Sequence, residues 1–174
     1  MHGGSPRLKW FIAGILGVIP LTLAACGASS DQTPATGSAS GAAKCPYLTS
    51  GDFMAIGKAL HGQPIANHQT DVQVRDCYYD LGTENDLAYL DFFDSPTVGQ
   101  QNYTNATLPG AGGGNPVPVS GVGNSAYWLP NGNTLFVKEG STVFQLKLNE
   151  SGKSNEQIRA DATQLASRIA DRIS

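Results

Sequence analysis

Residues 134–148, TLFVKEGSTVFQLKL, predict two β-strands joined by a tight turn. The dipeptide Glu139-Gly140 is typical of a hairpin, because glycine readily adopts the left-handed backbone that such turns need. After the turn, apolar and polar side chains alternate, which sends one set to each face of a sheet. The apolar set is Phe144, Leu146 and Leu148, and the polar set is Gln145 and Lys147. One face of this strand is therefore expected to be buried.

The segments on both sides of this hairpin extend the pattern. Asn131-Gly132 predicts a turn back to a strand at 125–129, SAYWL. Ser154 and Gln157 form a capping box, which begins a helix at the end of the chain. Its apolar residues recur at helical spacing on one side: Ile158, Ala162, Leu165, Ala166, Ile169 and Ile173. We therefore expect this helix to pack on the sheet.

The run DVQVRDCYYD, residues 71–80, predicts a strand for which two patterns are possible. Strict alternation gives one face the set Val72, Val74, Asp76 and Tyr78. A β-bulge near Asp76 gives one face the set Val72, Val74, Cys77 and Tyr79, and we expect the bulge. A short loop then leads to 87–94, LAYLDFFD, which is apolar on both faces and predicts a central strand.

Two further helices are predicted. Thr49 or Ser50 can cap the first, and Gly62 offers its end. Ser95, followed by proline, begins a second helix over 95–106, and a Gly/Pro-rich loop follows at 108–118.

The elements thus run in the order α-ββ-α-βββ-α. This order predicts an α+β fold in which an antiparallel sheet of about five strands has its helices packed on one face. Residues 45–174 have the length of a single domain with one core.

The beginning of the chain is typical of an export signal. Arg7 and Lys9 precede an apolar run at 10–23, which is shorter than the ~20 residues of a membrane-spanning helix. The sequence Leu23-Ala24-Ala25-Cys26 resembles the lipobox of bacterial lipoproteins. The resemblance implies that residues 1–25 are a signal peptide, that Cys26 carries a diacylglyceryl group, and that the protein is anchored on the outer face of the cell membrane.

The segment 26–44 consists mainly of Gly, Ala, Ser and Thr, and predicts a flexible, lipid-anchored linker because it has no large apolar side chain to bury. With Cys26 lipidated, Cys45 and Cys77 remain as an even pair in an oxidising compartment, which predicts a disulfide. A metal site needs more ligands than two distant cysteines supply.

Charge and motifs argue against several classes of function. The chain has a net charge of −3, which becomes −5 when the two basic residues of 1–25 are removed, so we expect no nucleic-acid partner. The glycine-rich run 110–115 lacks the residues of a phosphate-binding loop, and no nucleophile-elbow motif is present. Asp91 and Asp94 lie three apart on a strand and point to opposite faces. We therefore expect no cofactor and assign no catalytic residue.

One enzymatic alternative stays open. His61 closes the first predicted helix and His68 follows it. Either histidine could serve as the base of an envelope hydrolase beside one of three acidic residues that we otherwise expect to be solvated: Asp80, Glu84 and Asp86.

Paired aromatic residues are more informative about binding. The pairs Tyr78-Tyr79, Phe92-Phe93 and Tyr127-Trp128 each lie in a predicted strand, so each pair sends one ring to either face. Rings that no helix covers line a pocket, form an exposed patch or lie under a loop. The candidate binding surface is Tyr79, Phe92, Tyr127 and Trp128.

The stretch 118–128, PVSGVGNSAYW, together with Cys45 and Cys77, resembles small lipoproteins of high-GC Gram-positive bacteria whose exported two-cysteine domain has no known function. The resemblance implies an α+β domain closed by a Cys45–Cys77 bridge, and it transfers no active site. We therefore expect a non-enzymatic lipoprotein that binds a small apolar or amphipathic ligand or an envelope protein. The alternatives are the hydrolase above and an accessory subunit of a membrane complex.

Overall fold

The computed structural model describes residues 45–70, 73–110 and 114–174. The expected signal peptide 1–25, the linker 26–44 with its anchor Cys26, and Val72 lie outside the described residues.

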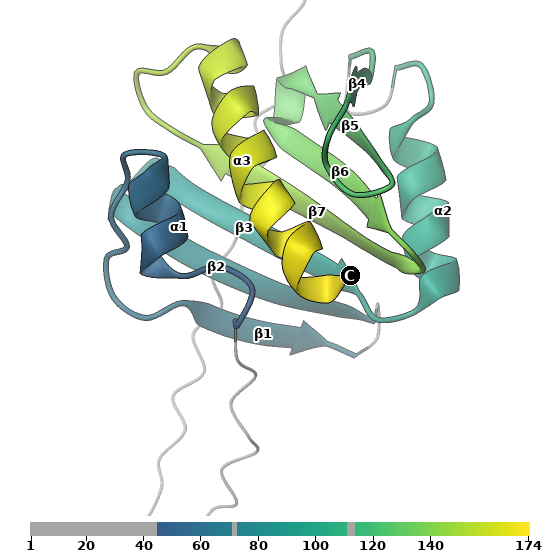
Figure 1. Ribbon diagram of the computed structural model, residues 1–174, viewed down its shortest axis with the longest axis horizontal. Coiled ribbons are helices and arrows are strands. Elements are labelled where there is room, and N and C mark those ends of the chain that lie inside the picture. Colours follow the sequence, from purple (N-terminus) through teal and green to yellow (C-terminus); the bar gives the residue numbers. More distant parts are fainter. Residues whose placement is uncertain (1–44, 71–72, 111–113) are drawn as a thin grey trace, which may run out of the picture. The chain divides into compact units, whose positions relative to one another are not determined.

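A seven-stranded antiparallel sheet forms the centre of the described domain, and three α-helices pack against it (Figure 1). The elements are α1 (Ser50–Ala55), β1 (Ile65–Gln69), β2 (Val74–Thr83), β3 (Asp86–Phe93), α2 (Pro96–Ala106), β4 (Val117–Val119), β5 (Ser125–Leu129), β6 (Thr134–Glu139), β7 (Thr142–Asn149) and α3 (Asn155–Ile173). The strand order is β1-β2-β3-β7-β6-β5-β4, so two meanders meet where β3 pairs with β7. The α+β class and the antiparallel sheet are confirmed.

The sheet has two more strands than expected, one at each edge. β1 has the sequence IANHQ and β4 has the sequence VPV. Neither strand shows the apolar alternation of a half-buried strand, because each pairs on one side only and remains largely exposed. The prediction of about five strands was wrong for this reason.

Helices α1 and α3 lie on the same side of the sheet (Figure 1), which we call the covered face. The apolar stripe of α3 packs there, with Ala162, Leu165 and Ile169 fully buried. The strands contribute their inward set to the same core, including Leu90 and Leu146. The capping box of Ser154 and Gln157 begins α3 as predicted.

Helix α2 packs on the opposite face, so the prediction that all helices lie on one face was wrong. Its buried residues Tyr103 and Ala106 form a second cluster with Phe136 and Val143. Gly99 allows the close approach, since a Cβ at this position would lie 3.0 Å from the Cβ of Val143. This helix covers the part of that face formed by β5, β6, the start of β7 and the end of β3 at Phe93. We call the remainder, formed by β1, β2, β3 and β7, the open face.

The first helix is shorter than expected. It ends at Ala55, and Gly57 follows with a φ of 74°. The N–H of Lys58 donates to the carbonyl of Phe53 at 2.9 Å, and that of Gly57 donates to Met54 at 3.0 Å. This is the Schellman geometry that stops a helix at a left-handed glycine. The stop therefore comes at Gly57 and not at Gly62.

Strand β2 follows strict alternation up to Asp80, so the predicted bulge near Asp76 was wrong. Its register with β3 is regular until an irregularity between Asp80 and Thr83. Regular pairing lets Cys77 and Tyr79 both enter the core. It also sends the alternate residues of β2 to the open face.

The predicted disulfide is present. Cys45 and Cys77 are bonded, with their Cα atoms 5.6 Å apart, and the bridge fixes the start of the described domain to the centre of β2. No helix within the described ranges is both long enough and apolar enough to cross a membrane.

Candidate functional site

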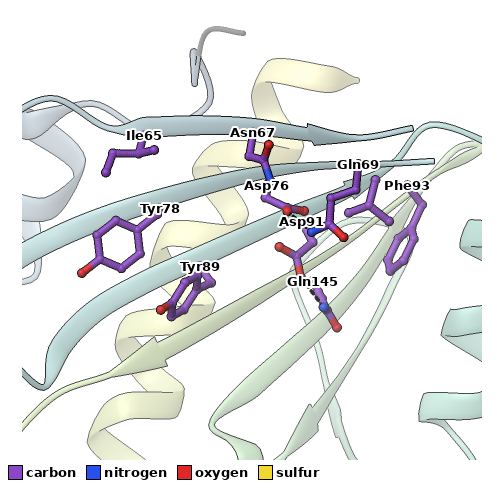
Figure 2. Close-up of a pocket in the computed structure, with 10 residues that line it drawn as sticks. Ile65, Asn67, Gln69, Asp76, Tyr78, Tyr89, Asp91, Phe93 and Gln145 are labelled. Atoms are coloured by element: carbon purple, nitrogen blue, oxygen red, sulfur yellow. Dashed lines mark hydrogen bonds between the residues drawn. The ribbon is translucent and has the colours of Figure 1, made fainter. Parts of the chain in front are cut away.

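The open face carries a groove of about 560 Å³ over β1, β2, β3 and β7 (Figure 2). Side chains that alternate outward from these strands line it. The apolar members are Ile65, Val74, Tyr78, Tyr89 and Phe93, and the polar members are Asn67, Gln69, Asp76, Asp91 and Gln145. The groove lies beside α2, which covers the neighbouring part of the same face.

Exposed apolar side chains form one end of the groove. Tyr78 and Tyr89 are directly paired across β2 and β3, and their ring centroids are 5.1 Å apart. The exposed fraction is 63% for Ile65 and 39% for Tyr89, although both are large and apolar. Exposed rings and aliphatic side chains that gather around a concavity are typical of binding sites.

Two carboxylates lie next to each other in the middle of the groove. Asp76 and Asp91 are directly opposite residues of β2 and β3, and both point to the open face. The side-chain amide of Gln69 donates to Asp76, and that of Gln145 donates to Asp91; Figure 2 shows the second pair. Among the described residues, no Lys, Arg or His lies within ion-pair distance of either carboxylate.

The environment of Asp91 disfavours its charged form. Burial raises the pKa of Asp91, the hydrogen bond from Gln145 lowers it in part, and the charge of Asp76 raises it further, so that the net shift is upward. A carboxyl group with a raised pKa beside a second carboxylate is a pattern found more often at functional sites than elsewhere.

Three of the four residues of the candidate binding surface lie in the core. Tyr79, Phe92 and Trp128 are at most 2% exposed on the covered face, which corrects their assignment as a surface. Trp128 also donates to Asn155 at 3.0 Å. Tyr127 is half-buried against Tyr103 of α2, with ring centroids 5.9 Å apart. Each aromatic pair does send one ring to either face. Tyr78, the neighbour of Tyr79, and Phe93, the neighbour of Phe92, line the groove.

The two histidines do not meet the carboxylates considered for a hydrolase. His68 lies 2.9 Å from Asp94, which also binds Arg75. The hydroxyl of Ser95 next to this cluster accepts the N–H of Val98 as the cap of α2. These groups thus have structural partners.

His61 packs its ring against Gly82, and its contact with Asp80 is a backbone hydrogen bond of 2.9 Å. Asp86 was expected to be solvated, which was wrong. It is buried, lies 2.7 Å from Lys58 and accepts the N–H of Ser151 at 2.6 Å. These hydrogen bonds hold the pKa of Asp86 well below its usual range.

The stretch that carries the lipoprotein resemblance, 118–128, forms the end of β4, a loop and most of β5. Gly121 and Gly123 have φ values of 80° and 53°. A Cβ at Gly123 would lie 2.7 Å from the backbone oxygen of Lys138, and the side chain of Asn124 accepts the N–H of Gly140 at 2.6 Å. The loop therefore closes over the β6–β7 turn and has a structural role.

Comparison with models of protein families, with curated proteins and with solved structures found no match to this chain. Within the described part of the chain, no group of three or more His, Cys, Asp or Glu residues could hold a metal ion. The site rests on its geometry: an open groove with apolar walls and two adjacent carboxylates.

Proposed function

We propose that the protein is a lipid-anchored binding module on the outer face of the cell membrane, and that a small apolar or amphipathic ligand occupies the groove on the open face. The groove carries this proposal. Its volume of about 560 Å³ lies within the ~300–1,000 Å³ that small-molecule sites have. Two of its apolar side chains, Ile65 and Tyr89, are exposed, although α2 covers the neighbouring part of the same face.

The proposal is for binding and not for catalysis. Asp94 is engaged with both His68 and Arg75, and the hydroxyl of Ser95 caps α2. The groove instead presents groups that bind a ligand by contact: rings, aliphatic side chains, amides and carboxylates, all held on rigid strands. An envelope protein that presents an amphipathic group could use the same contacts.

The binding site is tested with the neutral apolar dye Nile red and the full chain. We expect the dye's fluorescence to rise on binding, and Tyr89→Ala to weaken the binding by about three- to tenfold, because it removes a large part of one apolar wall. Met54→Ala is the matched control, since Met54 is 66% exposed and lies on α1. Equal binding by the two variants would contradict the proposed site.

The anchor is tested separately, because it depends on Cys26 alone. Mass spectrometry of the membrane-derived protein is expected to find two acyl chains on a thioether-linked diacylglyceryl group at Cys26, which is then the first residue. Cys26→Ser is expected to leave the protein unlipidated and released from membranes. An unmodified Cys26 in the native protein would exclude the anchor and leave the groove unaffected.

A further inference from the structure

The groove differs in charge from the rest of the described domain. Elsewhere in the described domain, the buried carboxylates have a basic partner: Asp52 with Arg172 at 2.9 Å, Asp86 with Lys58 at 2.7 Å, and Glu150 with Lys153 at 2.7 Å. Asp76 and Asp91 have amide partners, which leave their negative charge uncompensated. The groove thus lacks a cation of its own.

The amide partners also orient the two carboxylates. Gln69 donates to Oδ2 of Asp76, and Gln145 donates to Oδ2 of Asp91. Oδ1 of each carboxylate accepts no hydrogen bond from any described residue. Directly opposite residues on neighbouring strands have Cβ atoms ~4.5–5.5 Å apart, so one small donor group can reach both carboxylates.

An ammonium group matches this arrangement. It has three N–H donors and one positive charge, and it forms its strongest hydrogen bonds with carboxylates. The rings of Tyr78, Tyr89 and Phe93 line the same groove and favour a cation near their faces. The adjacent basic residue of this face, Lys147, lies opposite Tyr89 and is exposed; it does not line the groove.

We propose that the groove binds a primary amine with an apolar body, with the ammonium group on Asp76 and Asp91 and the apolar body against Ile65, Tyr78 and Tyr89. This inference rests on the proposed binding function and adds the charge of the ligand. It assigns Asp76 and Asp91 to recognition, and Gln69 and Gln145 to positioning their carboxylates.

Three probes that share an eight-carbon chain and differ in head group test the inference on the full-length protein. They are octylammonium, 1-octanol and octanoate. Isothermal titration calorimetry at pH 7 is expected to give octylammonium an affinity about tenfold higher than that of octanol, which corresponds to one charge-assisted hydrogen bond. Octanoate is expected to bind most weakly. Added salt should weaken the binding of octylammonium and leave that of octanol unchanged.

Charge-removing variants locate the effect. Asp76→Asn and Asp91→Asn are each expected to reduce the ratio of octylammonium to octanol affinity by about three- to tenfold. Glu84→Gln removes the same charge from the exposed β2–β3 turn and should leave the ratio unchanged. Tyr89→Ala should weaken all three probes together. Thermal unfolding of each variant establishes that it is folded before binding is measured.

The outcomes separate this inference from the proposed function. Equal affinities for octylammonium and octanol, both sensitive to Tyr89→Ala, would overturn the amine assignment and leave the binding groove in place. A preference for octylammonium that persists in a double variant carrying both Asp76→Asn and Asp91→Asn would place the cation elsewhere and overturn the assignment. Absence of binding by all three probes would overturn both proposals.

Discussion

Replacing Asp91 by asparagine is expected to stabilise the protein at neutral pH. Asp91 is half-buried and lies directly opposite Asp76, so its negative charge is both partly desolvated and repelled. Asparagine has the same shape and keeps an oxygen that can accept the hydrogen bond from Gln145. The substitution therefore removes an unfavourable charge and preserves the contacts.

The magnitude follows from the cross-strand geometry. Like charges at directly opposite positions cost roughly 0.2–1 kcal/mol, and the partial burial of Asp91 adds to this cost. We expect Asp91→Asn to raise the free energy of unfolding by about 0.5–1 kcal/mol at pH 7. For a domain of the size of residues 45–174, this corresponds to a rise in Tm of about 2–4 °C.

The sign of the pH dependence follows from the raised pKa of Asp91, whose first cause is burial. A carboxyl group with a folded-state pKa above its unfolded value contributes most to stability below the unfolded pKa, ~3.9. That contribution is lost as the pH rises through the folded-state pKa. The advantage of Asp91→Asn should therefore be full at pH 7 and disappear toward pH 3.

The assay is urea unfolding of the wild type and Asp91→Asn at a series of pH values from 7 to 3. Glu84→Gln serves as the control, because removing an exposed charge in a turn should change the free energy of unfolding by less than ~0.5 kcal/mol. A variant less stable than the wild type at pH 7, or a difference that does not change with pH, would refute the reasoning.

Three further predictions concern the fold. Cys77→Ser opens the disulfide between positions 32 apart in sequence and should lower the free energy of unfolding by about 3–4 kcal/mol, measured in urea. Arg172→Met removes the basic partner of Asp52. Burial raises the pKa of Asp52, but hydrogen bonds from Arg172 and Thr49 lower it, and the net shift is downward. The variant should therefore lose about 1–3 kcal/mol of unfolding free energy at pH 7, and this loss should shrink as the pH falls through the carboxyl range. Gly123→Ala should lower Tm more than Gly121→Ala, because both glycines have positive φ and only the first meets a backbone oxygen; equal shifts would contradict this.

The parts of the fold that could be predicted from sequence are those with strong local patterns. Alternation in 142–148, the capping box at Ser154 and the Ser95-Pro96 start each depend on neighbouring residues, and the structure has β7, α3 and α2 there. The edge strands β1 and β4 have no apolar alternation in sequence, because each pairs on one side only and is largely exposed. The side on which α2 packs also depends on tertiary contacts, notably between Gly99 and Val143.

The candidate site was missed because it depends on the register between two strands. Asp76 and Asp91 are distant in sequence, and only regular pairing of β2 with β3 makes them neighbours. The expected bulge at Asp76 removed the alternation that would have placed Asp76, Tyr78 and the residues opposite them on one face. Strict alternation of DVQVRDCYYD was the available signal.

The stability and binding predictions for Asp91 together separate a structural role from a functional one. If the carboxylate served the fold, as Asp52 and Asp86 do through their basic partners, its removal would cost stability. If it serves a cationic ligand, the same substitution should raise the free energy of unfolding and lower the affinity for octylammonium. Residues in functional sites often reduce stability in this way, because selection retains them for binding. Opposite signs for the two measurements on one variant, with neither seen in Glu84→Gln, are therefore the specific expectation for a charged group held ready for a ligand.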